Sequence, residues 1–429
     1  MQKIKAKTLS GFMELTPEKQ IVFNEMKDKI ISVFKLNGLS PMDTPILEYS
    51  EVLLAKAGGE TEKQIYRFKK GDTDMCMRFD LTVPFAKYVA IHQNELIFPF
   101  RRYQVGKSFR GERAQKGRFR EFYQFDVDII SDENLSLNAD AECIDIFSQI
   151  FEALDKRVII KINNRKIING LIEFYKLTDK SDEIMLLLDK KSKISEEKFL
   201  EELKKLTSKA NEIQKILNLN EPQALLNYKI ENKLFLQGVQ EMQNILEILK
   251  IRDIKNQYVF DQSIIRGLAY YTGIVFEANL VDLDEKISVG GGGRYDNLAE
   301  TFTDKNFCGV GSSVGLSRLF DLLDKNGLLQ FSKTTTSSLA IIPLNNTIKE
   351  CLALSKTLIK SGISNEVLYF DKPFKSKLNY ANKKRIPFIT VVGEDEIQSN
   401  LYSLKNMETG ESIKTDSRGL IELLGGKVE

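Results

Sequence analysis

The sequence predicts an α+β protein, and three patterns along its 429 residues support that fold class. Strand-like alternation mixed with helical spacing fills residues 1–168 and returns at 257–331. Residues 169–256 are rich in lysine, glutamate and leucine at helical spacing, which predicts a helical insertion. A polar serine and threonine run at 332–337 reads as a linker. Short apolar runs then alternate with helical stretches over 338–429, which predicts a separate α/β domain with a mostly parallel sheet.

The composition excludes several kinds of chemistry. The chain has 62 Lys and Arg against 60 Asp and Glu, so any affinity for nucleic acid has to come from local clusters of charge. His92 is the only histidine. This excludes a metal site with two histidine ligands and leaves a serine triad only if the triad uses this residue. The four cysteines are far apart with no C-x-x-C pair, so we expect no structural metal and no disulfide framework. With no apolar targeting or membrane segment, we expect a cytoplasmic protein.

The most basic segment is Arg101–Arg120, which holds eight basic residues and one acid, Glu112. Two strand-like runs, VGKSFRGE and RFREFYQFDVDII, flank a turn-like stretch at 113–117, which predicts an antiparallel hairpin. Alternation assigns one face of the second run to the core, namely Phe119, Tyr123, Phe125, Val127 and Ile129. The opposite face carries Arg118, Arg120, Phe122, Gln124, Asp126 and Asp128. An exposed face of cross-strand ion pairs is the usual alternative, but the order from cations through an aromatic ring to carboxylates favours an elongated polar pocket.

Several motifs in this sequence resemble those of the histidyl-tRNA synthetases, a family of the class II aminoacyl-tRNA synthetases. FRGE at 109–112 with Arg118-x-x-x-Phe122 resembles motif 2, and the continuation FYQFDVD is similar to the histidyl member. GLSPMDTPILE resembles motif 1, the dimer-interface helix and strand, and GVGSSVGLSRLFDLL at 309–323 resembles motif 3. IIRGLAYYTGIVFE at 264–277 and GGGGRYD at 290–296 resemble the two histidine-specific signatures. The resemblance implies a catalytic domain on an antiparallel sheet with flanking helices, a helical insertion and a C-terminal anticodon-binding domain.

The resemblance also implies residue roles at an ATP site. Arg110 would hold the α-phosphate, Glu112 would read the adenine amino group, and Phe122 would stack on the adenine. Arg118 and Arg318 would reach the phosphates. A guanidinium offers paired donors to phosphate and an aromatic face holds a purine, so the residue types suit these roles. The implied catalytic residues are Arg110 and Arg266.

The same resemblance implies a histidine site. Asp80, Thr82 and Gln124 would bind the α-amino group, and Arg110 borders the same substrate. Asp128, Tyr270 and Tyr271 would hold the two imidazole nitrogens and thereby reject side chains without two opposed polar atoms. Arg266 would lie between the substrate carboxylate and the α-phosphate, where negative charge develops.

The implied partners are tRNA(His), L-histidine, ATP with Mg²⁺, and a second copy of the chain in a homodimer; we expect no protein-held metal and no membrane. The loop residues Arg113, Gln115, Lys116 and Arg120 would approach the acceptor end of the tRNA. The segment KPFKSKLNYANKKR at 372–385 would contact phosphates near the anticodon, although a solvated helix face explains any single lysine as well.

The implied reaction is the activation of histidine by ATP, with release of pyrophosphate, followed by transfer of the histidyl group to tRNA. Two alternatives belong to other classes: a histidine-sensing regulatory subunit of ATP phosphoribosyltransferase, and a sensor of uncharged tRNA. Three positions depart from the family pattern. Ser317 stands where an acid is usual, Ala269 where an aspartate is common, and Asp80 where many members have glutamate. None of these changes removes a residue assigned to direct chemistry.

Overall fold

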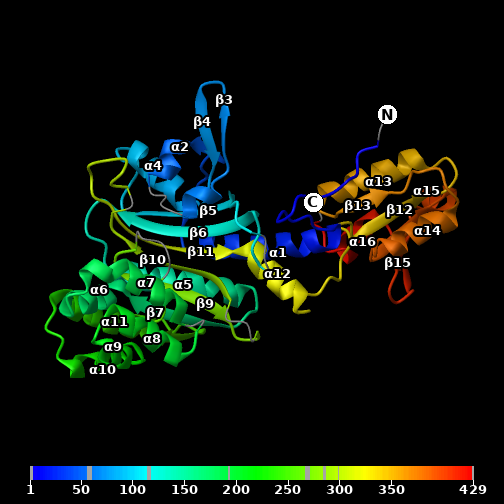
Figure 1. Ribbon diagram of the computed structural model, residues 1–429. Coiled ribbons are helices and arrows are strands. Elements are labelled where there is room, and N and C mark those ends of the chain that lie inside the picture. The colour runs from blue at the N-terminus through cyan, green and yellow to red at the C-terminus, as the bar shows by residue number, and fades with distance from the viewer. Residues whose placement is uncertain are drawn as a thin grey trace. The chain divides into compact units, whose positions relative to one another are not determined.

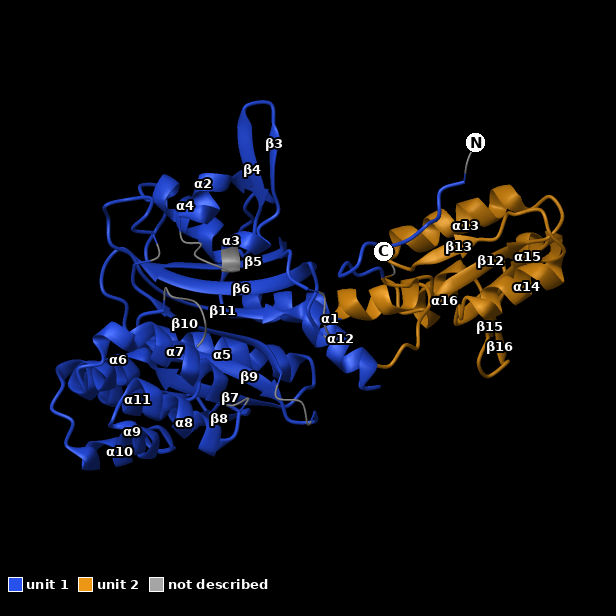
Figure 2. Cartoon of the chain, in the orientation of Figure 1, with its two compact units in different colours: residues 1–14, 26–328 blue, residues 15–25, 329–429 orange. Residues whose placement is uncertain are grey.

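The computed structural model describes residues 3–55, 60–113, 117–191, 194–265, 271–283, 287–297 and 299–427 (Figure 1). It divides into two compact units (Figure 2). The larger unit comprises residues 1–14 and 26–328, and the smaller comprises 15–25 and 329–429.

The larger unit is built on an eight-stranded sheet with the strand order β1-β5-β6-β11-β10-β9-β7-β8. Its strands are β1 (Ser40–Pro41), β5 (Phe100–Phe109), β6 (Glu121–Ser131), β7 (Val158–Asn164), β8 (Gln257–Phe260), β9 (Ile274–Leu280), β10 (Ser288–Tyr295) and β11 (Cys308–Gly315). The central pairs are antiparallel, whereas β1 pairs with β5 and β7 with β8 in parallel. The predicted α+β class with an antiparallel catalytic sheet is therefore confirmed.

The predicted hairpin is formed by β5 and β6, whose register runs from Phe100 opposite Ile130 to Phe109 opposite Glu121. It differs from the prediction at Phe119 and Arg120, which both precede the first residue of β6. Phe119 was expected on the core face, but it precedes the first residue of β6 and lines a cavity instead. The alternation of faces holds only inside a strand, so it could not place a residue in the connecting loop.

Helices flank this sheet, and a three-stranded sheet, β2-β4-β3, lies beside it in the larger unit (Figure 1). The elements before the hairpin are α1 (Pro17–Leu36), β2 (Leu47–Tyr49), α2 (Ser50–Leu54), α3 (Glu60–Gln64), β3 (Arg67–Lys70), β4 (Thr73–Met77) and α4 (Thr82–His92). Two more helices flank the sheet, α5 (Leu137–Ala153) and α12 (Leu316–Lys325). Residues 15–25, which include the first turns of α1, belong to the smaller unit.

The stretch predicted to be a helical insertion is helical. It contains α6 (Arg165–Phe174), η1 (Thr178–Lys180), α7 (Ser181–Lys190), α8 (Glu196–Leu206), α9 (Ala210–Leu217), α10 (Pro222–Leu225), η3 (Leu226–Tyr228) and α11 (Lys233–Ile251). Side chains satisfy the first turns of three of these helices, because Asn164, Ser195 and Asn232 accept hydrogen bonds from backbone N–H groups. No helix in the described part of the chain is long and apolar enough to span a membrane.

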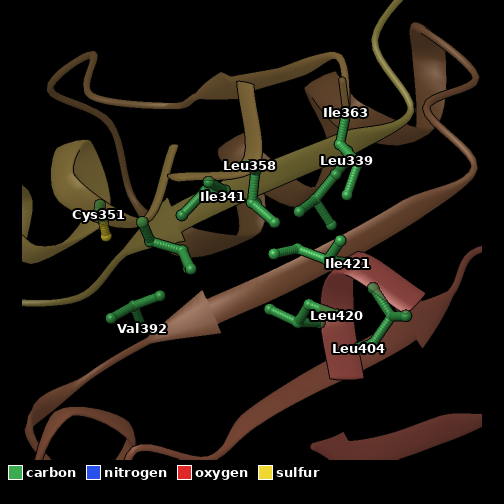
Figure 3. Close-up of a cluster of buried hydrophobic side chains, with 10 residues drawn as sticks. Leu339, Ile341, Cys351, Leu358, Ile363, Val392, Leu404, Leu420 and Ile421 are labelled. Atoms are coloured by element: carbon green, nitrogen blue, oxygen red, sulfur yellow. The ribbon is translucent and has the colours of Figure 1, made fainter. Parts of the chain in front are cut away.

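The smaller unit has a five-stranded sheet in the order β13-β12-β14-β15-β16. Its elements after the linker are β12 (Leu339–Pro343), α13 (Ile348–Lys360), β13 (Asn365–Val367), α14 (Phe374–Lys383), β14 (Phe388–Val392), α15 (Glu394–Ser399), β15 (Tyr402–Asn406), β16 (Ser412–Thr415) and α16 (Ser417–Leu423). Successive residues of β12 face opposite sides of the sheet, so Leu339 and Ile341 join one apolar cluster (Figure 3) while Ala340 and Ile342 join another.

The prediction of a mostly parallel sheet in this unit was wrong. β12 pairs in parallel with β13 and β14, but β15 pairs antiparallel with both β14 and β16. The sequence signal for the β15–β16 hairpin is weak because β16 is short and its side chains are largely exposed. Gly410, with φ of +78°, lies in the connecting turn.

Candidate active site

A cavity of about 470 Å³ lies against the β6, β11 and β10 part of the large sheet. The start of α4, the loop between β5 and β6, and α12 contribute the rest of its lining. The predicted site residues that line it are Asp80, Thr82, Arg110, Glu112, Arg118, Phe122, Gln124, Asp128, Tyr271 and Arg318. Segments far apart in the chain therefore meet in one cavity, as the motif pattern predicted.

Some predicted site residues lie elsewhere. Gln115, Lys116, Arg266 and Tyr270, together with Ala269, fall outside the described residues. Arg113 is exposed. Arg120 shares the predicted face of the hairpin but does not line the cavity: its Nε donates to the carbonyl of Glu112 at 3.0 Å, which holds the loop backbone.

Even-numbered residues of β6 face the cavity, as the alternation predicted, and they include one that received no role. Asp126 lines the cavity between Gln124 and Asp128. Burial raises its pKa to about 7, although the charge of Arg102 acts in the opposite direction. Alternation along the strand places Asp126 on the same face as Gln124 and Asp128, and this was the signal in the sequence. The family motif gave this carboxylate no role.

Asp128 is held by two groups that the sequence reading missed. The Nη2 atom of the buried Arg102 lies 2.6 Å from its Oδ2 atom, and the Tyr295 hydroxyl donates to its Oδ1 atom. Burial raises the pKa of Asp128 to about 6, although Arg102 and the Tyr295 hydroxyl both oppose that rise. The carboxylate is thus fixed in place as an acceptor at the end of the cavity.

Two glycines of β11 make room for this pair. A Cβ at Gly311 would lie 2.2 Å from Oδ1 of Asp128, and a Cβ at Gly309 would lie 2.3 Å from the ring of Tyr295. Any larger residue at either position would displace a group of the site. The G-x-G spacing in motif 3 therefore has a packing cause in this structure.

Asp80 lies at the start of α4. Its Oδ1 atom accepts backbone hydrogen bonds from Thr82 at 3.1 Å and Val83 at 3.0 Å, so the carboxylate is tied to the first turn of the helix. Burial raises its pKa, while the Val83 amide and the nearby Arg110 charge act in the opposite direction. The helix thereby fixes this carboxylate against the cavity.

Arg110 lies between two aromatic rings. Its guanidinium carbon is 4.4 Å from the centre of the Phe79 ring and 5.0 Å from that of Phe122, and its Nε donates to the Phe79 carbonyl at 3.2 Å. Nearby, Nη1 of Arg118 pairs with Glu112 at 3.0 Å. This part of the cavity thus offers fixed cations beside an aromatic face.

Helix α12 ties the hairpin loop to the sheet. Arg318 donates from Nε to the Gly117 carbonyl at 2.8 Å and from Nη1 to the Ser288 carbonyl at 3.0 Å. Ser317, which replaces the usual acid of the family, accepts the Tyr123 backbone N–H at 2.9 Å. The serine thus links α12 to β6, and Arg318 borders the cavity from the same helix.

No group of three or more His, Cys, Asp or Glu side chains in the described part of the chain could hold a metal ion. His92 lies at the end of α4 and contacts Glu95 through Nδ1 at 3.0 Å, outside the cavity lining.

Sheet, hairpin and helix α12 together define a class II aminoacyl-tRNA synthetase catalytic domain. The histidyl-tRNA synthetase family model matches residues 11–319, and a model of the anticodon-binding domain matches residues 338–426. The chain belongs to the histidyl-tRNA synthetase family.

Individual relatives agree with the family models. The chain is 42% identical to the histidine–tRNA ligase of Clostridium acetobutylicum, with 96% of this chain and 98% of that protein covered. It is 44% identical to the corresponding Clostridium tetani protein, with 95% of each chain covered. A crystal structure of histidyl-tRNA synthetase from Nostoc sp. PCC 7120 superposes with a TM-score of 0.89 at 30% identity, covering 99% of each chain.

Proposed function

We propose that this chain is a histidine–tRNA ligase that activates L-histidine with ATP and transfers the histidyl group to the 3′ end of tRNA(His). The observation that carries the proposal is one cavity in which Arg110, placed between two aromatic rings, meets a row of polar side chains on β6. The first group suits a nucleotide, and the second suits an amino acid with a polar side chain. The family membership and the names of the relatives support the same activity.

At the nucleotide end, Arg110 binds the α-phosphate and Phe122 stacks on the adenine ring. Arg118, which pairs with Glu112 in the structure, turns to the phosphates, and this frees the glutamate for the adenine amino group. Arg318 adds a further cation, fixed by its bonds to Gly117 and Ser288. Mg²⁺ would enter with ATP and supply positive charge beside the phosphates, because hard cations prefer oxygen ligands.

At the histidine end, Asp80, Thr82 and Gln124 bind the α-amino group. Asp128 accepts one imidazole N–H, and Tyr271 partners the second nitrogen together with Tyr270. Asp128 can serve as a rigid acceptor because Arg102 and Tyr295 fix its orientation. A side chain without polar atoms at both positions leaves buried groups unpaired, which is the basis for selecting histidine.

In the first step, a carboxylate oxygen of histidine attacks the α-phosphorus of ATP, and the bond to the leaving pyrophosphate breaks. Arg110 and Arg266 stabilise the negative charge that develops there. In the second step, a terminal ribose hydroxyl of tRNA attacks the acyl carbon and releases AMP. Catalysis rests on positioning and fixed charge, so no side chain has to act as a nucleophile.

The tRNA contacts both units. The loop residues Arg113, Gln115, Lys116 and Arg120 contact the acceptor end, and the C-terminal domain at 338–429 contacts the anticodon. Helix α14 supports the contact with the anticodon. Lys375 and Lys383 are exposed on this helix, and so are two aromatic residues, Phe374 at 43% and Tyr380 at 37%. Cations with interleaved aromatic rings suit phosphates and unstacked bases.

The active form is a homodimer built through motif 1. In support, Ile46, Leu47 and Tyr49 of that region and Phe68 of β3, the opposite edge strand of the same three-stranded sheet, are between 41% and 61% exposed. Exposed apolar side chains on one small sheet favour burial against a second copy. The protein works in the cytoplasm, where Cys76, Cys143, Cys308 and Cys351 stay as free thiols.

The alternative, a histidine-sensing subunit of ATP phosphoribosyltransferase, is not favoured. A Bacillus halodurans protein titled as such a regulatory subunit or a histidyl-tRNA synthetase shares the fold, with a TM-score of 0.75 and 20% identity. That likeness concerns the fold alone. The anticodon-domain match at 338–426 and the placement of Arg110 and Arg318 in the cavity both support the ligase.

The proposal is tested by supplying the full chain with ATP, Mg²⁺, labelled histidine and a tRNA(His) transcript. We expect label to accumulate on this tRNA and not on a control transcript with a different anticodon and acceptor stem. Histidine binding without charging would instead identify a sensor protein.

A further inference from the structure

Asp126 is a cavity-lining carboxylate that the reaction described above does not use. It lies on β6 between Gln124 and Asp128, and its residue is 3% exposed. The strand register sets it opposite Ser313 of β11 and Gln104 of β5. Neither neighbour carries a charge, so the strands on both sides provide no ion-pair partner directly across from it.

The charges around Asp126 are mostly negative. Burial raises the pKa of Asp126 most, and Asp128 on the same strand and Asp80 before α4 raise it further. The charge of Arg102 and a side-chain hydrogen bond with Ser313 lower it. Arg102 is already engaged at 2.6 Å by Asp128. The other ionisable groups of this region are Arg110 beside Asp80, Cys143 near Asp128, Tyr295, whose hydroxyl donates to Asp128, and Tyr271 in the cavity lining. Asp126 and Asp128 share one buried arginine, Arg102, and Asp80 lies beside Arg110. The three carboxylates therefore outnumber the two arginines, which favours a cationic ligand.

Two neighbouring acceptors on β6 lack hydrogen bonds. Oδ1 of Asp126 and Oε1 of Gln124 are buried and have no partner among the described residues, whereas Nε2 of Gln124 donates to Ser313 at 3.0 Å. A buried acceptor without a donor is costly, so such a pair in a cavity indicates where a ligand supplies donors. An ammonium group carries three N–H donors and one positive charge, which matches these two atoms and the Asp80 carboxylate.

We propose that Asp126 is a specificity-determining residue that accepts an N–H of the substrate α-ammonium group, together with Gln124 and Asp80. The inference rests on the proposed function, which places an amino acid in this cavity. The Asp126 carboxylate then rejects ligands that have the imidazole and carboxylate of histidine but no ammonium group, because such ligands leave its charge buried and uncompensated.

Proton release accompanies this contact. In the free protein the pKa of Asp126 is about 7, so the carboxyl is partly protonated at neutral pH. The bound ammonium favours the carboxylate form, so the proton passes from Asp126 to the buffer as the ligand binds. Asp128, with a pKa of about 6, titrates over a lower range and keeps its ion pair with Arg102.

The test compares Asp126→Asn with Asp132→Asn, a matched exposed control beyond the end of β6. Calorimetry at pH 7 in two buffers of different ionisation enthalpy measures the affinity and the protons released. The ligands are histidine, histidinol, which keeps the ammonium, and 3-(imidazol-4-yl)propionate, which lacks it. We expect Asp126→Asn to weaken the binding of histidine and of histidinol by about tenfold or more. The affinity for the propionate should change by less than about threefold. Proton release with histidine should fall in this variant alone.

Equal weakening of all three ligands would overturn the inference, because Asp126 would then contact the imidazole or support the fold. Unchanged histidine affinity and proton release in Asp126→Asn would overturn it as well, with the proposed function intact. A wild-type chain that binds none of the twenty amino acids would overturn the proposed function and the inference together. Circular dichroism of both variants establishes that each is folded.

Discussion

The eight-stranded sheet of the larger unit and the five-stranded sheet of the smaller unit differ in what they bury. The large sheet and its helices enclose charged side chains, among them Arg78, Arg102, Asp126, Asp128, Asp140 and Arg294. In the described part of the smaller unit, the buried polar side chains are those of Thr347 and Thr390. A buried charge costs free energy unless it is paired. In the larger unit these charges are buried, and two of them, Asp126 and Asp128, line the cavity. In the smaller unit no charged side chain of the described residues is buried.

The largest expected effect comes from the cation at the nucleotide end of the cavity. Replacing Arg110 with Ala should slow histidyl-adenylate formation by about 10³-fold, because a fixed donor to the developing phosphate charge is lost. Single-turnover adenylate formation measures it. Arg418→Ala, an exposed change in the smaller unit, should leave the rate within about twofold. A similar small change for Arg110→Ala would show that the catalytic charge lies elsewhere.

Core substitutions in the two units should lower the free energy of unfolding with a different dependence on pH. Arg102→Met removes the partner of Asp128 and should lower the free energy of unfolding by about 3–5 kcal/mol at pH 8. The folded-state pKa of Asp128 is already raised above its unfolded value, and losing Arg102 raises it further. Stability is therefore lost as the pH rises through that pKa, so the cost should shrink at pH 5, where Asp128 is protonated.

Leu358→Ala is the matched apolar change in the smaller unit, where Leu358 is fully buried in the cluster of Figure 3. It should cost about 2–5 kcal/mol at both pH values, because a cavity in an apolar core has no titrating group. Denaturant unfolding at pH 5 and pH 8 measures both variants. An equal pH dependence for the two would contradict the difference between the sheets.

Asp126→Asn should stabilise the fold while it weakens histidine binding. The folded pKa of about 7 lies above the unfolded value of 3.8, so in the wild type this residue's contribution to stability declines as the pH rises through 7. The asparagine does not titrate. We expect the variant to gain about 3 kcal/mol relative to the wild type between pH 5 and pH 8. A difference independent of pH would show that Asp126 does not titrate in this range.

The smallest expected effect lies on the surface of the smaller unit. Changing Lys372, Lys375 and Lys383 together to Ala should weaken tRNA(His) binding by about tenfold and reduce the salt dependence of the affinity. Fluorescence titration at several salt concentrations measures both, and adenylate formation should not change. An affinity equal to that of the wild type would place the tRNA contacts on another face. Lys384 is a suitable control because Glu366 already pairs with it at 2.8 Å.

The sequence predicted the parts of the site that follow short-range rules. The hairpin and the polar face of β6 followed from alternation, and the meeting of distant segments followed from the family motifs. Arg102 and Tyr295 were missed because their contacts with Asp128 join separate strands, and no local pattern records such a pairing. The prediction for Phe119 was wrong because β6 begins only at Glu121, and the alternation of faces does not extend to the residues before the strand.

Burial explains the remaining differences. Asp126 lies on the predicted polar face, but only the structure shows that its Oδ1 lacks a partner among the described residues. The β15–β16 hairpin was missed because β16 buries almost nothing, so no alternation of polar and apolar residues marks it. In both cases the missing information is which neighbours surround the residue.

The central claim is that one cavity holds both ATP and L-histidine and joins them. Amino-acid-dependent exchange of pyrophosphate into ATP, measured with each of the twenty amino acids, tests that claim most directly. We predict rapid exchange with histidine and at least about 10³-fold slower exchange with any other amino acid. No exchange with histidine, or equal exchange with several amino acids, would contradict it.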